Sequence, residues 1–295
     1  ERLGVESSAG IGSEVADTAW RMPLVSQSSV RDAGVRTDAR KGPGALPTGE
    51  VRVADFVDHT LLKAETTKSQ IELLCREARE FRFAAVCVNG SWVETCAKLL
   101  SGCDVKVAAV VGFPLGAMTT DAKTRETREL IEQGADEIDM VVALGHLFDS
   151  DWDYVEDDIR AVVDAAAGRG VKVILEAGAL DPMQLVKGCT LAKLAGAAFV
   201  KTSTGFHPSG GATAEAVALM RLAVGEELGV KASGGVRDCA TALRMIAAGA
   251  NRIGTSSGVQ LVECIGREPV LLKELLRDPD SHEQLCRTGN CPTDY

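Results

Sequence analysis

Two lysines in strand-like segments are the residues of this sequence best suited to covalent chemistry. Lys201 ends an apolar run that starts at Ala197, and the small, hydroxyl-rich stretch 202–205 follows it. Lys231 lies further along the chain and precedes a turn of serine and glycine, 233–235. Burial disfavours a charged ammonium, and a second cation nearby disfavours it further. Because a neutral lysine amine attacks carbonyl groups, the pair predicts Schiff-base formation at Lys201.

A simpler interpretation of Lys201 is a strand-end lysine that extends to water. That interpretation suits a lone lysine. It suits two lysines less well when each follows an apolar segment and precedes a turn of small residues. Strongly perturbed ionisable groups gather at functional sites, so the paired pattern favours a shared site for Lys201 and Lys231.

Three acidic residues are candidates to work beside these lysines. Asp139 lies between Ile138 and Met140 in an apolar segment, so its carboxylate needs a partner inside the fold. It could form a structural ion pair with the lysines, or move protons during Schiff-base formation. Glu176 could face the core, bond to Lys201 or face solvent. Asp58 could support the site or lie in a solvated loop.

The elements that must hold these residues alternate regularly from Val51 onward. Short apolar segments end in polar or glycine turns, and a helical pattern follows each of them. Eight such segments predict strands over 56–62, 84–88, 105–112, 137–142, 171–176, 198–201, 230–232 and 252–254. Repeated strand-helix units of this kind predict an α/β fold, an eight-stranded parallel (β/α)8 TIM barrel. An open doubly wound sheet is the alternative, but it requires a glycine-rich turn that is missing after the first strand.

Glycine and serine turns follow the seventh and eighth predicted strands, at 233–235 and 254–258. Barrels often bind phosphate with the loops in these two positions. Glycine lets backbone N–H groups approach an anion closely, and serine hydroxyls add donors. The two turns together therefore predict a phosphate site, to which Arg237 could add a positive charge.

Composition limits the remaining possibilities. The chain has 295 residues, 45% of them hydrophobic, and a formal net charge of −10, which argues against nucleic acid or an anionic membrane as partner. No apolar run reaches membrane-spanning length. The nine cysteines include no Cys-x-x-Cys pair, so we expect reduced thiols in a cytoplasmic protein. The four histidines lack metal-ligand spacing, so we expect no metal and no cofactor.

Three regions are predicted along the chain. Residues 1–50 are rich in Ser, Gly and Ala and end in a Gly-Pro-Gly stretch, as expected for a flexible leader or linker. The barrel domain is expected over 51–280. The stretch 288–294 is polar and rich in turn formers, which predicts a mobile tail over residues 281–295 that ends at Tyr295.

Five motifs in this order resemble the deoxyribose-phosphate aldolase family. They are Asp58 to Lys63, Val111 to Gly116, Glu137 to Val141, Phe199 to Gly205 and Lys231 to Arg237, within a resemblance that runs from about residue 53 to 266. The resemblance implies a metal-independent class I aldolase on a β/α barrel. It implies reversible cleavage of 2-deoxy-D-ribose 5-phosphate, a small sugar phosphate, into acetaldehyde and D-glyceraldehyde 3-phosphate. A homodimer is common in the family, although no interface is visible in the sequence.

The resemblance also implies roles for individual residues. Lys201 resembles the Schiff-base lysine, Lys231 the lysine that favours its neutral form, and Asp139 the acid/base aspartate. The residues that match positions of the family's phosphate site are Gly205, Gly234, Gly235, Ser256 and Ser257. Asp58, Glu176 and Tyr295 are further candidates, the last because some relatives carry a tyrosine on a tail that reaches the site.

Two departures from the family pattern stand near the site. Ala177 replaces a threonine, which removes a hydroxyl, and Phe206 stands where some relatives have a lysine, which predicts weaker phosphate affinity. Two other functions stay open at this point. One is a phosphate-binding barrel isomerase or synthase in which the lysines act only as cations, and the other is a silent binding protein on the same barrel.

Overall fold

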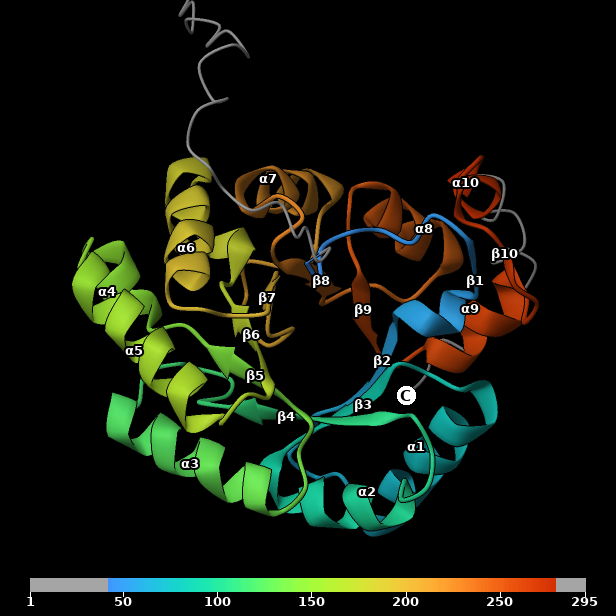
Figure 1. Ribbon diagram of the computed structural model, residues 1–295, viewed down its shortest axis with the longest axis horizontal. Helices are drawn as coiled ribbons and strands as arrows, with labels where there is room; N and C mark the ends of the chain where they lie inside the picture. Colours follow the sequence, from blue (N-terminus) through green and yellow to red (C-terminus); the bar gives the residue numbers. More distant parts are fainter. Residues whose placement is uncertain (1–41, 280–295) are drawn as a thin grey trace, which may run out of the picture. The chain divides into compact units, whose positions relative to one another are not determined.

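The computed structural model describes residues 42–279, and its centre is a closed barrel of parallel strands (Figure 1). The strands follow one another in chain order: β2 (Val57–Leu61), β3 (Ala85–Val88), β4 (Lys106–Val111), β5 (Glu137–Val141), β6 (Gly170–Ile174), β7 (Phe199–Lys201), β8 (Gly229–Ser233) and β9 (Arg252–Thr255). Pairing of β2 with β9, with Asp58 opposite Gly254, closes the barrel. The closed barrel confirms the predicted fold and excludes the open sheet.

Helices surround the barrel as an outer ring in Figure 1. They are α1 (Lys68–Phe81), α2 (Val93–Leu99), α3 (Thr120–Glu132), α4 (Leu144–Phe148), α5 (Trp152–Ala165), α6 (Pro182–Leu194), α7 (Ala214–Val224), α8 (Cys239–Ala247), α9 (Gly258–Ile265) and α10 (Leu272–Leu275). Helix α6 begins as its sequence indicates, since the Asp181 side chain accepts from Gln184 N at 2.8 Å and Pro182 takes the first helical position. The short α4 was not predicted, because five residues are too few to show a helical period.

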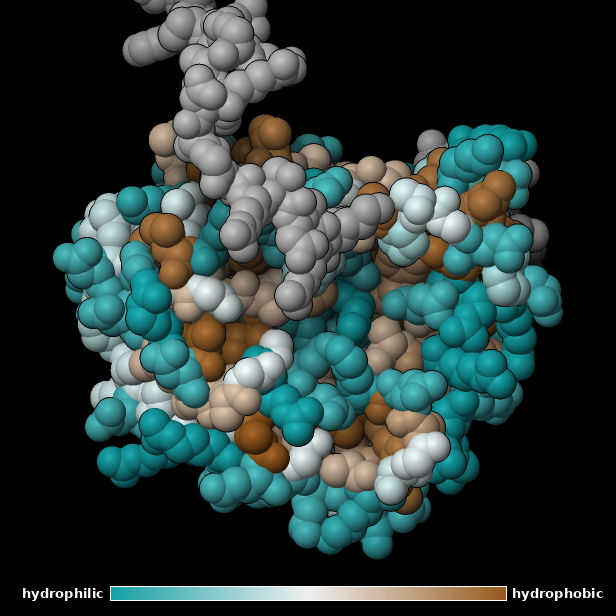
Figure 2. Space-filling view, in the orientation of Figure 1, coloured by the Kyte–Doolittle hydropathy of each residue, from teal (hydrophilic) through white to brown (hydrophobic). Residues whose placement is uncertain are grey.

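The strands bury both of their faces. On β3, Val86 and Val88 point outward into the main core, which fills the space between the strands and the helices. The alternate residues Ala85 and Cys87 point into the barrel instead. This double burial explains the continuous apolar runs in the sequence. The visible outer rim of the molecule is largely hydrophilic, as expected for amphipathic helices that cover a core (Figure 2).

The segment before the barrel is packed against it from residue 42 onward. Gly44 N donates to the Glu226 carbonyl at 3.2 Å, and Asn251 Nδ2 donates to the Gly44 carbonyl at 3.1 Å. A Cβ at Gly44 would collide with the Leu228 carbonyl oxygen, so this close approach requires glycine. Strand β1 (Glu50–Val51) then pairs with β10 (Val270–Leu271). Residues 42–50 of the predicted leader therefore belong to the packed structure, whereas residues 1–41 and the predicted tail lie outside the described residues.

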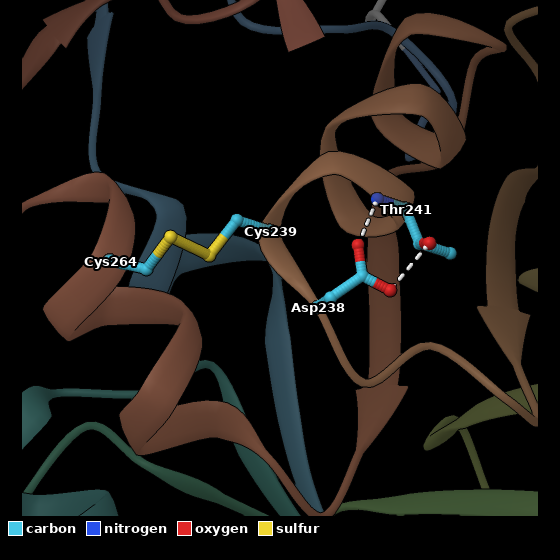
Figure 3. Close-up of a disulfide and its surroundings, with 4 residues drawn as sticks. All are labelled: Asp238, Cys239, Thr241 and Cys264. Atoms are coloured by element: carbon cyan, nitrogen blue, oxygen red, sulfur yellow. Dashed lines mark hydrogen bonds between the residues drawn. A yellow bond between two sulfur atoms is a disulfide. The ribbon is translucent and has the colours of Figure 1, made fainter. Parts of the chain in front are cut away.

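One pair of cysteines departs from the expectation of reduced thiols. Cys239, the first residue of α8, forms a disulfide with Cys264 near the end of α9, as Figure 3 shows. Beside it, the Asp238 carboxylate caps α8 by accepting from Thr241 N and Oγ1, both at 2.8 Å. The expectation is wrong for this pair, because a sequence without the fold does not show which cysteines on different helices come together. The free cysteines among the described residues are Cys75, Cys87, Cys96, Cys103 and Cys189.

Candidate active site

The interior of the barrel is divided into an apolar part and a charged part. Strands β3 and β4 contribute small apolar side chains, which are Ala85, Cys87, Ala108 and Val110. The strands β2 and β5 to β9 contribute the ionisable side chains Asp58, Glu137, Asp139, Lys172, Lys201, Lys231 and Arg252. The small residues on one side leave room for the long charged side chains on the other.

Asp139, on β5, is the centre of the charged part. Its fully buried carboxylate accepts from three lysines: from Lys172 Nζ at Oδ1, at 2.8 Å, and from Lys201 Nζ and Lys231 Nζ at Oδ2, at 2.9 and 2.8 Å. Burial raises the pKa of Asp139, but the attraction of the three ammonium groups outweighs it and holds that pKa well below its usual range. The carboxylate is therefore ionised and hydrogen-bonded to both lysines singled out in the sequence.

The two predicted lysines differ in their surroundings. Lys231 is fully buried and contacts two carboxylates, Asp139 at 2.8 Å and Asp58 at 2.6 Å. Burial lowers the pKa of Lys231, but these two acids outweigh it and hold the pKa well above its usual value, so Lys231 stays a cation. Lys201 contacts Asp139 and lines the cavity at this end of the barrel. Lys201 is thus placed to meet a substrate, with Lys231 behind it.

Three members of this cluster were not predicted, namely Glu137, Lys172 and Arg252. Lys172 lies between two carboxylates of β5, with Nζ 2.6 Å from Glu137 and 2.8 Å from Asp139. Arg252 contacts Asp58 at 2.6 Å and Glu137 at 3.3 Å. The signal was present, because Lys172 lies between Val171 and Val173 just as Asp139 lies between apolar neighbours. Attention to the strand ends alone missed residues that lie deeper in the barrel.

Positive charge exceeds negative charge inside the barrel by one. The cations are Lys172, Lys201, Lys231 and Arg252, and the anions are Asp58, Glu137 and Asp139, which gives four against three. An unbalanced buried charge is costly, so the cluster favours the loss of one proton. Lys172, Lys231 and Arg252 each contact two carboxylates within 3.3 Å, whereas Lys201 contacts one. Lys201 is therefore the cation of this cluster with the fewest carboxylate contacts.

A cavity of about 300 Å³ opens above Lys201 at the carboxyl ends of the strands. The predicted residues that line it with Lys201 are Gly205, Gly234, Gly235 and Ser256, whereas Asp139 and Lys231 lie beneath it. Ser257 is not part of the lining, and its N–H donates to Thr255 Oγ1 at 2.9 Å. Gly234 has a φ of +87°, and a Cβ there would lie 3.0 Å from Gly211 Cα, so this turn depends on glycine.

Glu176 supports the loop after β7. Its buried carboxylate accepts from Thr204 Oγ1 at 2.6 Å and from Thr204 N at 3.2 Å. Thr204 Oγ1 in turn accepts from Phe206 N at 3.1 Å. Glu176 is thus core-facing and holds the cavity wall, and its carboxylate bonds to Thr204 and not to Lys201 among the described residues. The neighbouring Ala177 donates its N–H to the Thr202 carbonyl at 2.7 Å, so the residue without the hydroxyl still joins the same loop.

The cavity mouth combines an apolar pair with two cations. Phe206 is about half exposed and meets Phe113 edge-to-face, with ring centroids 5.3 Å apart. Lys63 and Arg237 also line the cavity and are exposed. These two residues bring positive charge to a mouth at which Phe206 supplies none.

Asp58 lies in the barrel interior, where it is fully buried against Lys231 and Arg252. Burial raises the pKa of Asp58, but Lys231, Arg252 and Lys172 outweigh it and lower that pKa below its usual range. Of the two alternatives for Asp58, support of the site and a solvated loop, the structure has the first, because Asp58 is buried against the cluster inside the barrel. Tyr295 lies outside the described residues.

Two features of residues 42–279 concern metal binding and membrane insertion. No group of three or more His, Cys, Asp or Glu side chains in this part of the chain could hold a metal ion. None of its helices has both the length and the apolar character needed to cross a membrane.

Comparison with known proteins relates this geometry to one family. The family model described as DeoC/LacD family aldolase matches residues 52–262. The deoxyribose-phosphate aldolase of Geobacillus sp. (strain WCH70) is 59% identical, over 72% of this chain and 96% of the relative, and that of Streptococcus uberis is 54% identical over 72% and 96%. A solved deoxyribose phosphate aldolase from Aeropyrum pernix, described as a unique tetrameric structure, is 34% identical, covers 72% of this chain and 89% of its own, and has a TM-score of 0.67.

Proposed function

Because this chain belongs to the DeoC/LacD family of aldolases and is a lyase of the deoxyribose-phosphate aldolase type, we propose that it cleaves 2-deoxy-D-ribose 5-phosphate through a Schiff base on Lys201. The products are acetaldehyde and D-glyceraldehyde 3-phosphate, and the reaction is reversible. The observation that supports this proposal best is the position of Lys201, which faces the cavity while its amine bonds to Asp139.

The first step is attack of the neutral Lys201 amine on the C1 aldehyde of the open-chain sugar. Asp139 Oδ2, 2.9 Å from Lys201 Nζ, is placed to take the proton that the nitrogen loses and to return it to the departing hydroxyl. Loss of water then gives an iminium ion. Lys231 keeps its positive charge beside this site, which favours the neutral form of the attacking amine.

The iminium ion then withdraws electrons from the bond between C2 and C3. This bond must break, because the products carry two and three carbons. The C3 hydroxyl gives its proton, through water, to Asp139 as it becomes the aldehyde of glyceraldehyde 3-phosphate, and the remaining two carbons stay on Lys201 as an enamine. Protonation of the enamine at C2 and hydrolysis release acetaldehyde and restore the amine.

The phosphate is held at the cavity mouth, away from Lys201. The turns that contain Gly234, Gly235 and Ser256 line this part of the cavity and present small residues to it. Lys63 and Arg237 add positive charge from two different loops. Their position suits the phosphate carried on C5 of the sugar. Binding the phosphate there places C1 at Lys201. The two cations replace the charge that Phe206 does not provide.

The experiment is to incubate the purified protein with 2-deoxy-D-ribose 5-phosphate and measure both aldehyde products. The proposal predicts acetaldehyde and glyceraldehyde 3-phosphate in equal amounts, with much lower kcat/KM for 2-deoxyribose that lacks the phosphate. An isomerised sugar phosphate without any acetaldehyde would contradict the proposal and favour a phosphate-binding isomerase.

A further inference from the structure

A second tier of ion pairs lies below Asp139, towards the end of the barrel away from the cavity. It consists of Glu137, the first residue of β5, and Arg252, the first residue of β9. Glu137 is 5% exposed and contacts Lys172 at 2.6 Å, Arg252 at 3.3 Å and Lys106 at 2.9 Å. This tier lies too deep to touch a substrate in the cavity above Lys201.

Lys172 connects this tier to Asp139. Its Nζ lies 2.6 Å from Glu137 Oε2 and 2.8 Å from Asp139 Oδ1, so one ammonium joins the two carboxylates of β5. Its next carboxylate contact is Asp58, at 4.0 Å. The ammonium of Lys172 therefore has two short contacts, and Glu137 makes the shorter one. Without that contact, Lys172 would depend on Asp139 alone.

We infer that Glu137 is a positioning residue for the aldol reaction, which fixes Lys172 on Asp139 Oδ1 so that Oδ2 is left for Lys201 and Lys231. The inference rests on the proposed function. Glu137 acts through Lys172 and does not reach the reacting atoms. One oxygen of Asp139, Oδ2, is then held in a fixed orientation toward Lys201 Nζ. Proton transfer to and from this nitrogen requires such an orientation.

Glu137 also sets the charge balance of the cluster. The charged groups that face it are Lys106 on β4, Lys172 on β6, Arg252 on β9, with Asp58 and Asp139 further along the same chain of contacts. Burial raises the pKa of Glu137, but Lys172 and Arg252 outweigh it and lower that pKa below its usual value, so Glu137 is a full negative charge. Its removal would leave the interior with two excess cations, and this repulsion disfavours the charged form of every amine in the cluster, including the one that lines the cavity.

These two roles predict an unusual combination of effects for Glu137→Gln, which keeps the shape and removes the charge. Turnover should become slower by about tenfold or more, because Asp139 is less well oriented. KM for the sugar phosphate should change less than twofold, because the phosphate site is at the other end. Trapping of acetaldehyde on Lys201 by borohydride should reach half of its maximal rate at a pH lower by about one unit, because the excess positive charge favours the neutral amine.

Lys106→Met is the matched control. Lys106 contacts the same carboxylate, but its side chain is half exposed and faces solvent. This variant should keep the kcat and the trapping profile of the unchanged protein. An equal loss of kcat in Lys106→Met and Glu137→Gln would overturn the inference, because any change at this end of the barrel would then disturb the site.

Glu137→Asp keeps the inference testable if Glu137→Gln does not fold. The shorter side chain keeps the charge but withdraws from Lys172, so kcat should fall while the trapping profile stays in place. Wild-type kcat in a folded Glu137→Asp variant, or an unshifted trapping profile in folded Glu137→Gln, would overturn the positioning role. Absence of an adduct on Lys201 in the unchanged protein would instead contradict the proposed function, so the two failures are distinguishable.

Discussion

At the scale of single residues, three lysines surround one carboxylate, and their surroundings are unequal. Lys172 and Lys231 each contact a second acid, and both have a pKa raised above the usual value, because their acidic partners outweigh the effect of burial. Lys201 is the one of the three that lines the cavity. The proposed roles, with Lys201 as nucleophile and Lys172 and Lys231 as fixed cations, are therefore supported by which ammonium groups contact a second acid.

The role of Lys231 predicts a shift of the pH profile. Since its two carboxylate partners hold the pKa of Lys231 well above the usual value, the residue stays cationic at neutral and moderately alkaline pH. Lys231→Leu removes that positive charge, so the neutral form of Lys201 becomes less favourable, and the acidic limb of the profile of kcat/KM against pH should move to higher pH by about one unit or more. An unchanged limb in a folded variant would contradict this role.

Sequence reasoning was able to select Lys201, Lys231 and Asp139, because a charged residue inside an apolar strand demands a partner. It placed Asp139 and the lysines together, as their hydrogen bonds now do. It could not select Glu137 or Arg252, since each begins a strand and resembles an exposed strand-end charge. The side chains of Glu137 and Arg252 enter the interior because of the strand register. In that register, Asp139 lies opposite Lys172 and Lys231 lies opposite Arg252.

At the scale of elements, the loop after β7 depends on a contact with β6. Glu176, which follows β6, accepts from Thr204, and Thr204 accepts from Phe206 N. One threonine hydroxyl thus connects two strand ends and orders the stretch that contains Gly205. The sequence left three positions open for Glu176, because the conformation of a residue just after a strand is not fixed by the apolar pattern.

Loss of this contact should affect substrate binding more than chemistry. Thr204→Val removes the hydroxyl and leaves the Glu176 carboxylate with one donor fewer. The unsatisfied acceptor should lower the free energy of unfolding by about 1–3 kcal/mol. We expect KM for the sugar phosphate to rise about tenfold with kcat within about threefold of the original value. Thr190→Val, which removes a hydroxyl bonded to the Val186 carbonyl on α6, is the control and should leave both constants unchanged. An unchanged KM in Thr204→Val would show that the loop does not need this contact.

The disulfide between α8 and α9 is the other feature at this scale. It closes a loop with a sequence separation of 25 residues, and cross-links of this size stabilise a fold by about 2–4 kcal/mol. Reduction should therefore lower the melting temperature of the protein by roughly 5–10 °C. The double variant Cys239→Ser with Cys264→Ser should melt at the lower temperature and should not respond to reductant. Peptide mapping without reduction that finds both thiols free would contradict the bridge.

At the scale of the whole molecule, the barrel carries a charged interior where most barrels of this kind carry branched apolar residues. Small residues on β3 and β4 make the space for it, and every strand from β5 to β9 contributes a charge. The sequence predicted the barrel because double burial leaves continuous apolar runs. It could not predict that residues 42–50 pack against the barrel, since glycine and proline in that stretch indicate a linker as readily as a close approach.

The charged interior predicts how stability depends on pH. The pKa values of Asp58, Glu137 and Asp139 lie below their usual values of 3.8, 4.5 and 3.8. The contribution of these three carboxylates to the free energy of unfolding is therefore present above about pH 4. It is lost as the pH falls through their lower folded-state pKa values. The lysine contributions, with raised pKa values, are present below pH 10.5 and are lost only above it.

Melting temperature measured against pH should therefore be nearly constant between about pH 5 and 9 and fall steeply below about pH 4. Because the pairs are buried, 1 M salt should move this acid limb little. Loss of stability that begins near pH 6, or an acid limb that salt shifts strongly, would contradict a buried, ionised cluster.

Borohydride trapping with acetaldehyde, followed by intact mass and peptide mapping, tests directly whether Lys201 forms a Schiff base. We expect a single ethyl adduct on Lys201, and none in a folded Lys201→Arg variant, which should also lose turnover. An adduct on Lys231 would reverse the roles of the two lysines. A folded protein that forms no adduct, or a Lys201→Arg variant that keeps near-normal turnover, would contradict Schiff-base chemistry at this site.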